Sequence, residues 1–201
     1  MHAPRRVLPD PRLILASASP RRQQLLSDAG FHFDIDPAEI DESAHPASIL
    51  PSQVAIYLAE AKARAVATRH PDDIILAADT IVCFGDQILG KPADAKQATR
   101  MLSLLSGTTH LVITGVCVEH RAARFHKSAR VMSAVRMKLL TKAEIDQYVA
   151  TNAWQGKAGG YGIQDPDPFV TRQTGSHTNI VGLPMEITIP LLAEAGIRPA
   201  R

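Results

Sequence analysis

A long apolar run, Ile74 to Phe84, constrains the fold most, because only Asp79 and Thr80 interrupt it. Such a run predicts a β-strand. Shorter apolar runs that start and stop abruptly predict further strands at residues 13–16, 111–118, 131–139 and 180–181.

Helices with recognisable start and stop signals are predicted between several of these strands. Ser19 followed by Pro20 marks the start of one helix, and Gly30 marks its end. Thr141 and Glu144 have the spacing of a capping box that opens another helix. Further helices are predicted over residues 52–69 and over a segment ending at residue 107. A last helix is predicted to run to about residue 195, with a kink or a restart at Pro190. This alternation predicts one α/β domain with two lobes flanking a cleft.

The composition fits one globular domain with a sizeable core: 201 residues, 45% apolar and 21% charged. A net charge of +2 gives no indication of nucleic-acid or membrane binding. Residues 1–11 are predicted to be a loose tail on a domain of residues 12–201, and no apolar stretch has the length of a secretory or membrane-spanning segment. Cys83 and Cys117 are expected to be buried, reduced thiols of a cytoplasmic protein, with a disulfide as the alternative.

Residues 17–22, a cluster of small, polar and basic residues, fall where the first strand turns into the first helix. A helix N-terminus presents unpaired backbone N–H groups and the positive end of the helix dipole. Arg21 and Arg22 run against the usual preference for acids in a first helical turn, which favours an anion such as phosphate there. The alternative is a solvated helix start whose arginines pair with surface acids.

Asp79 is a second candidate, because a carboxylate in an apolar run is costly to bury unless it is paired or binds a metal. Acids at the carboxyl ends of strands line the ligand crevice of α/β sheets. The alternative is a structural aspartate that accepts backbone hydrogen bonds at a bend.

Four other charged residues, Glu42, Lys62, Lys91 and Lys157, are spread over separate segments. Lys157 stands between glycines, which let the backbone approach a ligand closely, and we expect it to bind phosphate although the P-loop spacing is absent. The other three are by themselves more typical of solvated charges. The dispersed histidines do not predict a histidine-rich zinc site, and no GxSxG motif indicates a serine hydrolase. The basic residues at 121–130 indicate a turn. We expect this turn to be solvated rather than to bind RNA.

Eight short segments together resemble the Maf family of nucleotide pyrophosphatases, in the order of that family and across residues 12–195. They are ASASPRR at 16–22, IDE at 40–42, LAEAKA at 58–63, AADT at 77–80, LGKP at 89–92, LSG at 105–107, KAGGYGIQ at 157–164 and NIVGLP at 179–184.

The resemblance implies an inosine-triphosphatase-like α/β fold, with a mixed sheet and flanking helices, and a homodimer that uses a divalent metal, Mg²⁺ or Mn²⁺. It also implies cleavage of a nucleoside triphosphate between its α- and β-phosphates. By motif, Asp79 is the general base for water, and Glu42 and Asp79 are the acids that hold the metal. Contacts to the phosphates fall to Ser17, Ser19, Arg22, Lys62 and Lys91.

Three residues make the chain similar to the branch of the family that acts on dTTP and UTP: Arg21, Thr80 and Gln164. Two departures from the family pattern, residues 165–168 and His177, are expected to alter the rim of the base pocket. Two alternatives to a strict dTTP/UTP pyrophosphatase remain. One is a broader enzyme that removes modified pyrimidine nucleotides, and the other is a regulatory protein that binds nucleotide or nucleic acid to restrain septum formation.

Overall fold

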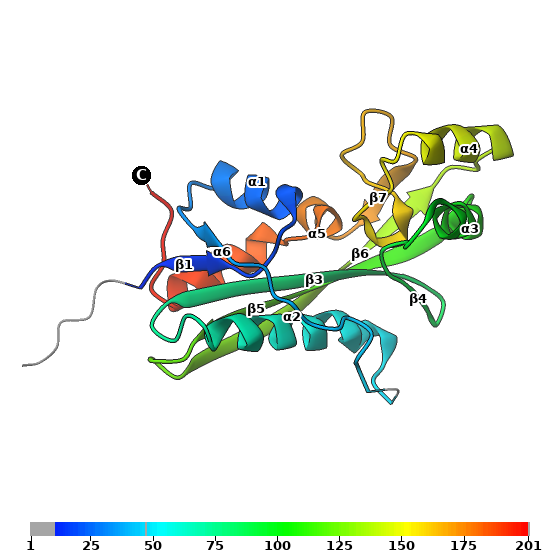
Figure 1. The fold of residues 1–201 in the computed structure, drawn as a ribbon. Helices are drawn as coiled ribbons and strands as arrows, with labels where there is room; N and C mark the ends of the chain where they lie inside the picture. Colours follow the sequence, from blue (N-terminus) through cyan, green and yellow to red (C-terminus); the bar gives the residue numbers. More distant parts are fainter. Residues whose placement is uncertain (1–10, 47, 201) are drawn as a thin grey trace, which may run out of the picture.

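Seven strands form one open sheet in residues 11–46 and 48–200, which the structure, a computed structural model, describes (Figure 1). The strand order is β2-β1-β3-β5-β6-β7, with β4 paired to β3 outside this path. β1 is parallel to β2 and β3, and the other pairs are antiparallel, so the sheet is mixed as expected. The strands are β1 (Leu13–Leu15), β2 (Asp34–Ile35), β3 (Ile74–Phe84), β4 (Gln87–Leu89), β5 (Thr109–His120), β6 (Phe125–Met137) and β7 (Val170–Thr174).

Helices cover both faces of the sheet. α2 lies along one face of β3 and β5, α1 and α6 lie on the opposite face, and α3 and α4 pack at the far end of the long strands (Figure 1). The helices are α1 (Pro20–Asp28), α2 (Pro51–Ala67), α3 (Ala95–Leu105), α4 (Lys142–Ala150), α5 (His177–Val181) and α6 (Met185–Glu194), with a short 3₁₀ turn η1 at Ala158–Gly160.

The core is divided between the two halves of the molecule. Leu15, Leu26 and Leu192 belong to a cluster that joins β1, α1 and α6, whereas Leu102 and Trp154 belong to a separate cluster around α3 and α4. The long strands β3 and β5 contribute residues to both clusters. The apolar packing separates in this way while the sheet runs through both halves. The two halves therefore form the predicted lobes on one continuous sheet.

Most sequence predictions for the elements are confirmed, with small shifts at their ends. Thr141 and Glu144 form the predicted capping box at the start of α4. α1 starts at Pro20 as predicted, although Ser19 makes no side-chain cap hydrogen bond. The second helix starts at Pro51 after Leu50, not after Ser52. The predicted tail lies outside the described residues apart from residue 11.

Two predictions of local structure are wrong. Residues 180–181, predicted as a strand, end helix α5, because the Ser176 side chain caps that helix by accepting from the Asn179 N–H at 3.1 Å. Residues 125–130, predicted as part of a turn, continue strand β6, which pairs with β5 down to the pair His120–Phe125. α6 also runs through Pro190, where the sequence predicts a kink or a restart.

Cys83 and Cys117 are buried free thiols, which confirms that prediction. None of the helices in the described residues combines the length and the apolar character needed to cross a membrane.

Gly115 of β5 allows α2 to lie very close to the sheet. A Cβ atom added there would lie 2.4 Å from the Ala55 carbonyl oxygen and 2.5 Å from the Ile56 Cα atom. These are backbone atoms of α2, so a side chain cannot be accommodated by a rotamer change. The absence of a side chain at Gly115 therefore sets the height of α2 above β3 and β5.

We expect Gly115→Ala to lower the free energy of unfolding by about 1–3 kcal/mol, the usual cost of overpacking a core. Gly90→Ala is the matched control, because nothing lies within 4 Å of a Cβ added at Gly90. Urea denaturation of the parent and both variants measures the difference. Equal stabilities would mean that α2 does not contact the sheet at Gly115.

Candidate functional site

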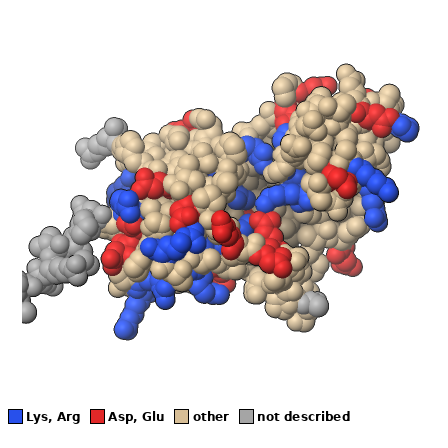
Figure 2. Space-filling model, in the orientation of Figure 1, with Lys and Arg blue, Asp and Glu red and all other residues tan. Residues whose placement is uncertain are grey.

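A cleft of about 500 Å³ lies between the two halves of the molecule. This volume is in the usual range for small-molecule sites. Its wall comes from segments far apart in the sequence: residues 16–22, 37, 38, 42, 62, 80, 82, 91, 112, 155–158, 161–165 and 180–182. Figure 2 shows Lys and Arg side chains in the hollow between the halves, with acidic side chains beside them.

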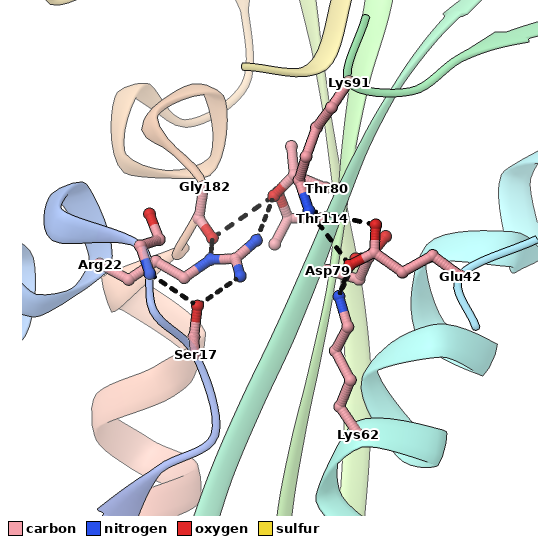
Figure 3. A network of polar contacts seen from close by, with 10 residues as sticks. Ser17, Arg22, Glu42, Lys62, Asp79, Thr80, Lys91, Thr114 and Gly182 are labelled. Atoms are coloured by element: carbon pink, nitrogen blue, oxygen red, sulfur yellow. Dashed lines mark hydrogen bonds and ion pairs between the residues drawn. The ribbon is translucent and has the colours of Figure 1, made fainter. Parts of the chain in front are cut away.

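On one side of the cleft, Arg22 of α1 points back towards the sheet (Figure 3). Its guanidinium group donates to the Gly182 carbonyl at 2.8 Å, to Ser17 Oγ at 3.0 Å and to Thr80 Oγ1 at 3.1 Å. Burial lowers the pKa of Arg22, while the charges of Asp79 and Glu42 act in the opposite direction. Arginine keeps its charge in proteins, so this side of the cleft holds a permanent, fixed cation.

On the other side, Lys62 of α2 connects two acids from different segments (Figure 3). Its Nζ atom lies 2.6 Å from Glu42 Oε1 and 2.5 Å from Asp79 Oδ1. The side chains of Lys62 and Asp79 are only 7% and 5% exposed. Lys91 adds a second cation, 3.1 Å from both carboxylate oxygens of Glu42.

The two lysines determine the charge of Glu42. Its partial burial would raise the pKa, but the hydrogen bonds and charges of Lys62 and Lys91 outweigh this and lower the pKa to about 2. Glu42 is therefore ionised at any physiological pH.

The alternation of β3 places its two polar residues on opposite faces. Asp79 faces α2 and Lys62, whereas the next residue, Thr80, faces Arg22 and lies 2.9 Å from Thr114 Oγ1. Thr80 and Lys62 line the cleft, but Asp79 is not among the described residues of its wall and lies beneath Lys62. Access to Asp79 from the cleft therefore depends on the position of the Lys62 side chain.

At the far end of the cleft, Arg21 donates to the Gly156 carbonyl at 3.0 Å, and Gln164 is exposed in the cleft wall. Lys157, predicted to bind phosphate, lines the cleft and forms an ion pair with Asp165. Asp165 also accepts from the Tyr148 hydroxyl at 2.8 Å. The Asp165 carboxylate therefore has two partners in this part of the structure, Lys157 and Tyr148.

The structure thus brings the predicted residues into two networks and one outlying group. Ser17, Arg22 and Thr80 form the first network. Glu42, Lys62, Asp79 and Lys91 form the second network. Arg21, Lys157 and Gln164 line the cleft outside both, whereas Ser19, also in the cleft wall, donates its backbone N–H to Ser17 Oγ at 3.3 Å.

Sequence reasoning missed three residues that support the site. Gly182 acts only through its backbone carbonyl, which no side-chain pattern predicts. Thr114 links Thr80 to the Asn179 carbonyl at 3.0 Å. The buried Asn179 amide donates to the Val112 carbonyl and to Ser133 Oγ, and so anchors α5 to the sheet. In the sequence, Thr114 interrupts the apolar run at 112–116, and Asn179 directly precedes the apolar pair at 180–181. This contrast with apolar neighbours was the signal that could have indicated both residues.

The donor set suits an anionic ligand. Fixed cations on both sides, the N-terminus of α1 and the buried acids together provide phosphate contacts and a position for a divalent cation. The two carboxylates that converge on Lys62 Nζ define a place where one cation is already held. Carboxylate groups are ligands that a divalent ion takes, so the chemistry of these residues fits such an ion in the cleft.

Comparison with known proteins agrees with this geometry. The model of the family described as Maf-like protein matches residues 12–195. A dTTP/UTP pyrophosphatase of Rhodospirillum rubrum is 48% identical, over 94% of this chain and 90% of the relative. Relatives with the same name from Anaeromyxobacter dehalogenans and Caulobacter vibrioides are 46% and 45% identical, over 92% and 94% of this chain and 95% and 98% of their own. The chain belongs to the Maf-like protein family.

Proposed function

We propose that this protein is a nucleoside triphosphate pyrophosphatase that hydrolyses dTTP and UTP to the monophosphate and pyrophosphate. The observation that carries the proposal is the Lys62 ammonium group shared by Glu42 and Asp79, beside a cleft that Arg22 and Lys91 also line. The names of its relatives, which match nearly the full length of the chain, support the same activity.

The triphosphate binds among the cations of the cleft. Arg22 and the N-terminus of α1 face one side of the chain of phosphates, and Lys62 and Lys91 face the other (Figure 3). Ser17 and Ser19 line the same wall and supply hydroxyl groups. These groups are preorganised, so they meet the negative charge that develops on the leaving pyrophosphate.

Mg²⁺ or Mn²⁺ bound by Glu42 and Asp79 would neutralise phosphate charge and polarise the phosphorus–oxygen bonds. Without a divalent ion, Lys62 compensates both acids. With substrate and a divalent ion bound, phosphate oxygens would replace the carboxylates as the partners of Lys62 and Lys91. The site therefore exchanges one set of paired charges for another, which avoids an unpaired buried charge at any stage.

Asp79 is the base for the attacking water. Its carboxylate is buried and accepts a hydrogen bond from Lys62, which orients it. It accepts the proton of a water molecule that attacks the α-phosphorus, and the bond to the bridging oxygen breaks, releasing pyrophosphate.

We assign selection of the nucleobase to Arg21 and Gln164. The Gln164 amide offers a donor and an acceptor, which match the N–H and a neighbouring carbonyl of uracil or thymine. Arg21, half-buried beside Gly156, adds donors for a carbonyl oxygen. Cytosine reverses part of this pattern, and a site built on hydrogen bonds rejects such a mismatch strongly. Modified pyrimidines with the same edge, such as 5-methyl-UTP, remain within the proposed substrate range.

The alternative of a regulatory, nucleic-acid-binding protein is not favoured. Two of the basic residues at 121–130 are engaged within the fold: Lys127 pairs with Glu194, and Arg130 donates to the Ser52 carbonyl at 2.8 Å. Homodimerisation and a cytoplasmic location, where nucleoside triphosphates are found, remain predictions.

We expect a nucleotide panel with Mg²⁺ to show turnover of dTTP and UTP, with CTP and 7-methyl-GTP far poorer. Chromatography of the UTP reaction should show UMP and pyrophosphate, and EDTA should stop the reaction. UDP as the main product would contradict the proposed function. A protein that binds nucleotide but releases no pyrophosphate would support the regulatory alternative.

We expect Asp79→Asn to lower kcat by about 10²–10⁴-fold, the usual contribution of a positioned base. Asparagine is nearly isosteric but cannot take the proton of water, so nucleotide binding should persist. Asp86→Asn, in the exposed turn after the same strand, is the matched control and should be fully active. An Asp79→Asn enzyme with more than half of the parent rate would show that Asp79 is not the base.

We expect Lys91→Ala to lower kcat/KM for UTP by a factor that corresponds to about 1.5–3 kcal/mol, the value of a charge-assisted contact. Lys127→Ala is the matched control, because Lys127 lies on β6 and pairs with Glu194 away from the cleft. Steady-state kinetics with both variants measure the effect. Equal losses would mean that the cleft is not where the triphosphate binds.

A further inference from the structure

A second cluster of ligand-type side chains lies between the β5–β6 hairpin and α2. Cys117 and Glu119 are on β5, and His126 of β6 is paired directly with Glu119 in the sheet register. Glu60 of α2 lies above them. Among the described residues, none of these four lines the cleft.

The ligand-type atoms of this cluster lie close together, slightly farther apart than two ligands of one bound zinc ion, so small side-chain movements would bring them into range. His126 Nδ1 lies 3.9 Å from Cys117 Sγ and 3.6 Å from Glu119 Oε2, and all three atoms lie within 4.8 Å of one another. The second distance is too long for a hydrogen bond. Two ligands on one tetrahedral zinc ion are roughly 3.3–3.8 Å apart, given the usual bond lengths.

Glu119 supplies an independent observation. Its Oε2 atom is shielded from solvent, and within the described residues it has no hydrogen-bond partner. A buried carboxylate oxygen without a partner is costly. The atom faces the space between His126 and Cys117, where a cation would provide the missing partner.

Glu60 is placed as an outer partner. Its Oε1 atom lies 3.8 Å from His126 Nε2, the ring nitrogen that does not face Cys117. Ser128 Oγ donates to the same oxygen at 2.5 Å and holds the carboxylate in place. Histidines that bind metals usually donate their second N–H to such a carboxylate. At 3.8 Å the contact is an ion pair and not yet a hydrogen bond, so the ring would have to move slightly towards Glu60 when a metal binds.

The charges of the cluster also fit a divalent cation. Burial, together with the carboxylates of Glu119 and Glu60, raises the pKa of the Cys117 thiol to about 12, while Arg64 of α2 acts in the opposite direction. A bound metal deprotonates such a thiol, and a thiolate with one carboxylate balances a charge of +2. His126, whose side chain is 43% exposed, leaves the space reachable from solvent.

We propose that Cys117, Glu119 and His126 bind one Zn²⁺ ion, with Glu60 orienting the histidine. The thiol proton is released to solvent, and water completes the coordination. A thiolate and an imidazole select Zn²⁺ over Mg²⁺, so this site is distinct from the metal position in the cleft. The ion joins both strands of the hairpin beneath α2 and stabilises that end of the sheet.

The test uses the full chain, stripped of metal with EDTA and desalted, and titrated with Co²⁺ and then Zn²⁺. Bound Co²⁺ should give the near-ultraviolet charge-transfer band that only a thiolate ligand produces, and Zn²⁺ should displace it. Cys117→Ser should remove the band. Cys83→Ser, which changes the other buried cysteine, should leave it intact.

Two further variants keep the test decisive if Cys117→Ser folds poorly. His126→Ala and Glu119→Gln change less buried residues and should weaken Co²⁺ binding by at least about tenfold, since loss of even an outer partner costs 10–100-fold. Asp79→Asn should leave the band unchanged, because it affects only the cleft. Absence of the band in excess Co²⁺, or a band that persists in Cys117→Ser, would overturn the proposal and leave His126 as an ion-pair partner of the two glutamates.

Discussion

The Lys62 ammonium group, held between Glu42 and Asp79, is the interaction on which the rest of the site depends. The side chains of Lys62 and Asp79 are nearly inaccessible to solvent, so removing Lys62 would leave Asp79 as an uncompensated buried charge, at a cost of about 3–5 kcal/mol for a fully buried pair. The interaction forms only because α2 lies close enough to β3 for a lysine to reach Asp79. The close approach in turn requires a residue without a side chain at Gly115, opposite Asp79 in the neighbouring strand.

The long central strands explain how one small domain supports a two-sided site. β3 passes through both halves of the molecule and, by the alternation of its side chains, presents Asp79 to α2 and Thr80 to α1 (Figure 3). The acids and the lysines paired with them therefore lie on one side of the strand, and the guanidinium of Arg22 lies on the other. The same sheet carries the Cys117 cluster further along β5, on the α2 face, so one helix covers both groups of charged residues.

The family, the fold class and most elements could be predicted from the sequence, because apolar periodicity, capping signals and ordered motifs are local properties. The strand at 74–84 and the capping box at Thr141 are examples. The α5 helix was missed because its apolar pair Ile180–Val181 is too short to distinguish a helix from a strand, and its identity depends on the Ser176 cap and on Asn179 anchored in the sheet. The pairing of Lys157 with Asp165 was missed because it depends on how one loop folds back on itself.

The sequence by itself determined which chemical groups the protein has and the order in which strands and helices present them. Asp79 in an apolar strand and Arg22 in a first helical turn were identifiable because each contradicts its local surroundings. Only the tertiary structure decided which groups meet: that Glu42, 20 residues before Lys62, shares its ammonium group with Asp79, and that Lys157 is bound within the chain. The physical reason is that partner choice follows from distances across the sheet and cleft, which packing sets and which spacing along the chain does not record.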